Sequence, residues 1–125
     1  MDLAAGDFEA PLRAPRLKGV LRLVIRCRHA SAVCWSISII LNSGRFDGRI
    51  DCIDWEHTFI DIDGARASGF HRRIWNAKAR SCERFKIPLP ALQPSSAEDF
   101  IVQGLTLMGV AIKEDLPDVS KMPIR

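Results

Sequence analysis

The feature that most constrains the fold is the alternation of apolar and polar side chains that begins at Val20. Over residues 20–27, and again over residues 33–41, apolar side chains occupy every second position. A period of two is typical of β-strands with one buried face and differs from the period of a helix. The link at residues 29–32 is too short for a crossover, so the sequence predicts an antiparallel hairpin.

Further strand-like segments follow at short intervals, at residues 49–55, 58–62, 69–75 and 81–87. Asn, Asp and Gly in the links between them favour tight turns. The apolar phase slips by one residue at Cys52 and Ile53, which predicts either a bulge or a strand covered on both faces.

A helix is predicted after the proline-rich connector at residues 88–94. Residues 95–98 match a capping box, and the apolar side chains that follow share one helical face down to Met108. A last short strand could follow at residues 110–112. The sequence therefore predicts an α+β fold in which an antiparallel sheet of five to seven strands packs against one helix in the C-terminal half.

Length and composition indicate a single globular domain. The chain has 125 residues, of which 47% are hydrophobic and 26% charged, close to the globular average. We expect the α+β domain to span residues 17–113, with a flexible N-terminal arm at residues 1–16 and a tail at residues 114–125. The four cysteines are spaced too widely for zinc motifs or a disulfide framework, so we expect reduced, buried thiols and no cofactor.

The apolar stretches are shorter than the roughly 20 residues needed to cross a bilayer. Acidic residues also occupy the start of the chain, where a signal peptide would carry positive charge. We therefore expect a cytoplasmic protein that has no membrane partner.

Charge is sorted between Arg45 and Lys86, with a mainly acidic stretch followed by a mainly basic one. Within the acidic stretch, Asp54, Glu56 and Asp61 are candidate metal ligands, because carboxylates at alternating strand positions share a face and bind hard cations. The alternative is a set of solvated carboxylates on the outward face of the sheet.

A second candidate site lies at residues 71–76. On a strand, His71, Arg73 and Trp75 would share one face and supply an acid or base, a phosphate clamp and a stacking plate. With His57 as a second acid or base, this group predicts a nuclease or toxin-like ribonuclease. The alternative is a basic strand whose tryptophan belongs to the core.

A third candidate is a basic face for phosphates, built from arginines on several strands together with the neighbouring tryptophan. Its members are Arg22, Arg26, Arg28, Arg72, Trp75, Arg80 and Arg84. If these arginines pair instead with the acidic stretch across neighbouring strands, both sets of charges are neutralised.

The motif Arg-Ile-Asp-Cys-Ile-Asp-Trp at residues 49–55 and His-Arg-Arg-Ile-Trp-Asn at residues 71–76 precede the proline connector and the helix. Over residues 49–109 this arrangement resembles small uncharacterised β-rich proteins carried by bacteria, their phages or mobile elements. Some of those proteins carry a His-x-His pair where this chain has His71 and Arg73. The resemblance implies an accessory or host-interaction role.

The leading hypothesis is a small non-enzymatic binding protein of bacterial or phage type that engages a macromolecule, with a protein as the expected partner, through a charged sheet face. The first alternative is a nuclease or toxin that uses His71 and His57 with Arg73 and the carboxylates. The second alternative is a nucleic-acid-binding module that does not cleave.

Overall fold

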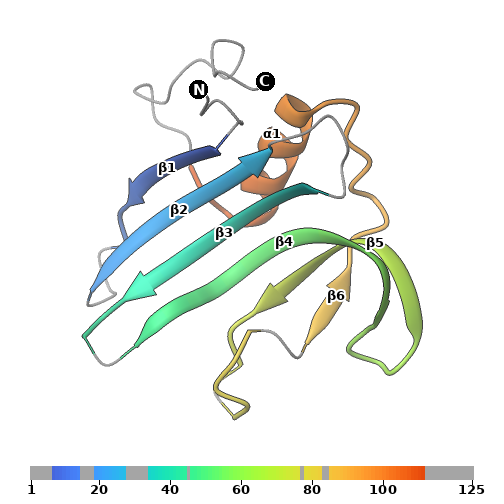
Figure 1. Ribbon diagram of the computed structural model, residues 1–125, viewed down its shortest axis with the longest axis horizontal. Coiled ribbons are helices and arrows are strands. Elements are labelled where there is room, and N and C mark those ends of the chain that lie inside the picture. Colours follow the sequence, from blue (N-terminus) through green and yellow to red (C-terminus); the bar gives the residue numbers. More distant parts are fainter. Residues whose placement is uncertain are drawn as a thin grey trace.

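The computed structural model describes residues 7–14, 19–27, 34–44, 46–76, 78–82 and 85–111. The described residues form one six-stranded antiparallel sheet and one helix (Figure 1). The elements are β1 (Asp7–Leu12), β2 (Val20–Cys27), β3 (Trp35–Asn42), β4 (Asp47–Ile60), β5 (Arg66–Ile74), β6 (Lys86–Pro88) and α1 (Ala97–Leu107). Neighbouring strands follow chain order, so the sheet is a meander. The predicted α+β fold is confirmed.

Strand β1 corrects the prediction of a flexible arm over residues 1–16. Residues 7–12 pair with β2, from Asp7 opposite Arg26 to Leu12 opposite Leu21. The strand was missed because its inward side chains include a small alanine and because it contains Pro11, which usually argues against a strand. Proline is tolerated here because β1 is an edge strand, where one row of backbone N–H groups has no partner strand.

Strand β4 merges two predicted strands, at residues 49–55 and 58–62, into one of 14 residues. It contains two register shifts against its neighbours, one beside Ile50 and one between Glu56 and Phe59. The first is the bulge that the phase slip predicted, two residues before the predicted position. Cys52 and Ile53 are also both fully buried, so the strand is covered on both faces there.

The remaining strands differ from the prediction mainly in length. β5 begins three residues before the predicted segment 69–75, and β6 keeps only the end of the predicted segment 81–87. Residues 110 and 111 are not in a strand, and the rest of the predicted last strand and tail lies outside the described residues.

Helix α1 begins one residue later than the capping box predicts. Ser96 is the N-cap, and its hydroxyl oxygen accepts a hydrogen bond of 3.0 Å from the Asp99 backbone N–H. The Asp99 carboxylate in turn accepts a bond of 2.9 Å from the backbone N–H of Ser95. This arrangement differs from a standard capping box, because aspartate replaces glutamate and its carboxylate bonds the residue before the N-cap.

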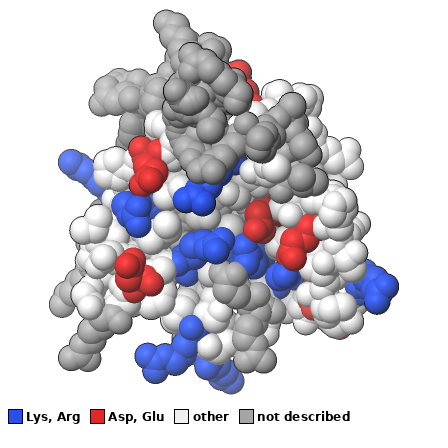
Figure 2. Space-filling view, in the orientation of Figure 1, with Lys and Arg blue, Asp and Glu red and all other residues white. Residues whose placement is uncertain are grey.

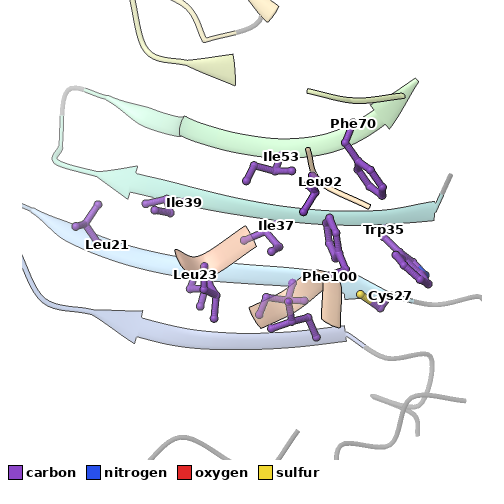
Figure 3. Packing of buried hydrophobic residues seen from close by; sticks show 13 residues of the cluster. Leu21, Leu23, Cys27, Trp35, Ile37, Ile39, Ile53, Phe70, Leu92 and Phe100 are labelled. Carbon is purple, nitrogen blue, oxygen red and sulfur yellow. The ribbon is translucent and has the colours of Figure 1, made fainter. Parts of the chain in front are cut away.

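The core lies between α1 and one face of the sheet (Figure 3). Phe100, Ile101 and Leu105 of the helix are buried against side chains of β2, β3, β4 and β5. Gly104 lets the helix backbone approach Ile37 of β3 closely, because a Cβ atom at this position would collide with the end of that side chain. In Figure 1, β2 and β3 cross in front of the helix. Within the described part of the chain, no helix is long and apolar enough to cross a membrane.

Candidate functional site

The face of the sheet opposite α1, hereafter the helix-free face, is set by the cross-strand register. Because side chains alternate along each strand, the residues between the core positions of β2 to β5 point to this face. Three cross-strand rows result: Arg22, Ile40 and Arg49; then Val24, Ser38, Cys52, Arg73 and Lys86; then Arg26, Ser36, Asp54, His71 and Pro88.

Five side chains of β4, β5 and β6 meet on this face and are called the charged cluster. His71 Nε2 lies 2.9 Å from Asp54 Oδ1 and 3.1 Å from Glu56 Oε1. Arg73 Nη2 donates to Asp54 Oδ2 at 2.7 Å, and Lys86 Nζ donates to Glu56 Oε1 at 2.6 Å. Each carboxylate of the cluster therefore has one full cation and the imidazole beside it.

His71 is completely buried within the charged cluster. The ring of Phe59 covers it, with the two ring centres 4.4 Å apart. Phe59 reaches this position through the second register shift of β4, and the Ile62 N–H then donates to the Lys86 carbonyl oxygen at 3.0 Å. The end of β4 thus curls towards β6 (Figure 1).

Both ring nitrogens of His71 face oxygen atoms. Nδ1 lies 3.3 Å from the Gly69 carbonyl oxygen, and Nε2 lies between the two carboxylates. The Nε2 contacts do not have full hydrogen-bond geometry. With no exposed surface, this imidazole cannot reach a substrate without movement of Phe59.

The charged cluster keeps Asp54 ionised. Burial is the largest influence on Asp54 and opposes ionisation, but His71, Arg73 and Arg49 together lower the pKa of its carboxyl group below the ordinary value of 3.8. Asp54 is therefore a carboxylate throughout the neutral pH range.

The thiol of Cys52 lies beside the cluster and is fully buried. Ser38 Oγ lies 3.4 Å from its sulfur, Arg73 Nη2 3.5 Å and Arg49 Nη1 3.7 Å. The four cysteines of the chain are free, as predicted, and Cys27, Cys52 and Cys82 are buried. The prediction of burial is wrong for Cys34, which is exposed at the start of β3.

The candidate metal ligands are not brought together. Asp54 and Glu56 lie in the charged cluster, but Asp61 lies in the turn after β4, where its Oδ1 accepts hydrogen bonds of 2.9 Å from the backbone N–H groups of Asp63 and Ala65. Across the described ranges, no group of three or more His, Cys, Asp and Glu side chains is arranged to hold a metal. The positions of Arg73 and Lys86 explain this, since they neutralise the carboxylates that a cation would need.

The two candidate acid–base histidines lie on opposite faces of the sheet. His57 is exposed and meets Trp55 edge-on, with ring centres 4.6 Å apart. Trp55 packs against the core on the helix side, whereas His71 lies on the helix-free face. The predicted pair of His57 and His71 is therefore not formed, because alternation along β4 places His57 on the face of Trp55, opposite that of Asp54 and its cross-strand partner His71.

Arg72 lies on the helix side and does not belong to a basic face. Its Nε and Nη2 atoms donate to the two oxygens of Asp51 at 3.0 and 2.7 Å, and its Nη1 atom donates to the Leu107 carbonyl oxygen at 3.1 Å. The hydrogen bond to Asp51 raises the pKa of Arg72 above its ordinary value. The side chain thus joins β4 and β5 to the C-terminal end of α1.

The other predicted binding residues are dispersed. Arg22 and Arg26 are exposed on the helix-free face, and Arg22 pairs with Glu9 at 3.0 Å. Trp75 follows the last residue of β5 and packs edge-on against Phe46 with ring centres 4.7 Å apart, so it does not share a surface with His71 and Arg73. Arg80 is exposed in the turn after β5. Arg28 and Arg84 lie outside the described residues.

Comparisons of the chain with protein-family models, with curated proteins and with solved structures find no match. The predicted resemblance to bacterial and phage proteins therefore stays a prediction.

Proposed function

We propose that this protein is a non-enzymatic binding protein that engages another protein through the helix-free face. The observation that carries the proposal is the interleaving of opposite charges on one face of the sheet, where Arg22, Arg26 and Arg49 are exposed while Arg73 is buried. Its described cations are Arg22, Arg26, Arg49, Arg73 and Lys86, and its described carboxylates are Glu9, Asp54 and Glu56. In Figure 2, positive and negative side chains lie next to one another across the middle of the view.

A mixed surface of this kind suits a protein partner better than a nucleic acid. A phosphate backbone is bound by cations that neutralise it, and carboxylates among those cations repel it. Here Arg22 is paired with Glu9 and Arg73 with Asp54. Complementary charge on a protein surface can match both signs and thereby fix orientation and exclude wrong partners.

The expected contact region is the part of the face nearest β2. Arg26 and Arg49 are exposed there, and Ser36 lies in the same cross-strand row as Arg26. The charged cluster lies on the same face, nearer β6, and holds β4, β5 and β6 in a fixed arrangement. This lowers the entropy cost of ordering the surface on binding. We expect an acidic patch on the partner and an accessory role in the cytoplasm of a bacterium.

Site-specific photo-cross-linking tests this proposal. p-Benzoylphenylalanine placed at Ser36 in the full chain should give one discrete protein adduct in living cells, whereas the same group at the exposed helix residue Val102 should not. Arg26→Glu should reduce the yield about tenfold, because it inverts a charge inside the contact region. Arg66→Glu makes the same change of charge at an exposed position at the far end of β5 and should leave the yield unchanged.

Equal adducts from Ser36 and Val102 would contradict the proposal. So would an adduct of Ser36 with RNA or DNA in place of protein, and that outcome would favour the nucleic-acid-binding alternative.

A further inference from the structure

A large cavity lies on the helix side of the sheet, beyond the end of α1. Its volume is about 1220 Å³, above the roughly 300–1,000 Å³ of typical small-molecule pockets. Most of its walls are apolar side chains from the sheet and from the segment after the helix, including Leu21, Ile39, Ile50, Ile74, Met108 and Val110. In Figure 3, Leu21 and Ile39 lie towards the opposite end of the sheet from Trp35.

The position of the helix explains why this space is open. α1 packs closely on β3 at Gly104 and ends at Leu107, so its buried residues cover only part of the apolar face. The segment from Met108 to Ala111 then runs along the cavity as part of its wall. The part of the sheet that α1 leaves uncovered carries apolar side chains such as Leu21 and Ile39, which suits an apolar occupant.

The charged groups that line the cavity leave it with an excess of positive charge. Its only described carboxylate is that of Asp51, which is already held by two hydrogen bonds from Arg72. Arg13 and Arg80 also line the cavity, and neither has a carboxylate partner in the described part of the chain. An anionic group is therefore the complement that the cavity lacks.

The backbone of Arg80 provides an independent indication. Its φ of 54° is the one positive value at a non-glycine residue among the described residues. The Arg80 N–H donates to the Asn76 carbonyl oxygen at 2.8 Å, and the Ala79 N–H donates to Asn76 Oδ1 at 2.9 Å, so the turn is tightly held. Such conformations are costly for side chains other than glycine, asparagine or aspartate, and they concentrate at ligand sites.

We propose that this cavity binds an elongated apolar molecule with one anionic group, of the class of a long-chain carboxylate. The apolar body would fill the space between the sheet and residues 108–111, and the anionic group would meet Arg80 and Arg13. This site lies on the other side of the sheet from the surface proposed to bind a protein. A result that contradicts one proposal therefore does not contradict the other.

Calorimetric titration of the full chain with dodecanoate and with 1-dodecanol, both below their aggregation concentrations, tests this site. Dodecanoate should bind about tenfold more tightly than the alcohol, as expected for one charge-assisted contact. Arg80→Gln should remove most of that difference without changing the affinity for the alcohol. Arg66→Gln, at an exposed arginine distant from the cavity, should alter neither affinity. Ile74→Trp, at a partly exposed wall residue, should weaken both ligands while thermal unfolding remains cooperative.

Equal affinity for the carboxylate and the alcohol would overturn the assignment of an anionic group. The chain continues from the cavity wall at Ala111, and its own residues 112–125 are the competing occupant. If neither ligand binds and nuclear Overhauser effects connect Ile74 with residues 112–125, the cavity is filled by the chain itself and the proposal is wrong.

Discussion

At the scale of single residues, the charged cluster combines groups that the sequence assigned to two separate sites. Asp54 and Glu56 were candidate metal ligands, while His71 and Arg73 were candidate catalytic groups. The alternation of each strand correctly placed His71 and Arg73 on one face. Alternation could not predict the register between β4 and β5, because the shift between Glu56 and Phe59 decides which carboxylate meets which cation.

The burial of His71 also changes the role that we assign to this side chain. A histidine among carboxylates on an open face would be a candidate acid or base, but this ring is fully buried beneath Phe59 and is a packed part of the fold. The sequence carries one weak signal of this difference, which is the run of three polar residues, 56–58, at the register shift that turns Phe59 onto the same face as His71.

Asp54 should make the protein sensitive to acid. Its pKa is lower in the folded chain than the ordinary 3.8 expected in the unfolded chain, so its contribution to stability is complete above about pH 4 and is lost as the pH falls through the folded pKa. Thermal unfolding followed from about pH 6 to about pH 2 should therefore show a steeper acid loss in the wild type than in Asp54→Asn, in which that titration is absent.

Asp63→Asn is the matched control, since Asp63 is exposed in the turn after β4. Its acid profile should follow that of the wild type. An unchanged acid profile in Asp54→Asn would mean that the charged cluster does not stabilise ionised Asp54.

At the scale of elements, the sequence predicted the helix more accurately than the strands. Residue spacing and the capping serines are local signals, and they placed α1 within one residue at each end. β1 and the continuous β4 depend on partners distant in the sequence. Sequence patterns did not predict them, because β1 contains a proline and the apolar phase changes within β4.

Gly104 determines how closely α1 lies on the sheet. Gly104→Ala should gain up to about 1 kcal/mol in helix propensity, but it places a methyl group against the buried Ile37, and overpacking typically costs about 1–3 kcal/mol. We expect net destabilisation of about 1 kcal/mol in urea unfolding, because Ile37 has no exposed surface into which it can move.

Val102→Ala makes a comparable change on the exposed side of the same helix and should alter the free energy of unfolding by less than about 0.5 kcal/mol. Stabilisation by Gly104→Ala would indicate that the contact between α1 and β3 is looser than described.

At the scale of the whole molecule, one sheet presents two different surfaces. On one side lie the paired charges that we propose as a protein-binding surface, and on the other lie a helix and an apolar cavity. Composition and periodicity predicted the sheet and the helix. They could not predict the cavity, because it exists only where α1 ends before the apolar face of the sheet does.

The separation of these two surfaces by the sheet is the central claim, and the three tryptophans of the chain allow a direct test by NMR. Trp75 lines the cavity, while Trp35 packs with Phe100 in the part of the core that α1 covers. Addition of dodecanoate to the full chain should shift the indole N–H resonance of Trp75 and leave those of Trp35 and of the Ser36 backbone unchanged. Equal shifts at Trp75, Trp35 and Ser36, or a shift confined to Ser36, would contradict the claim.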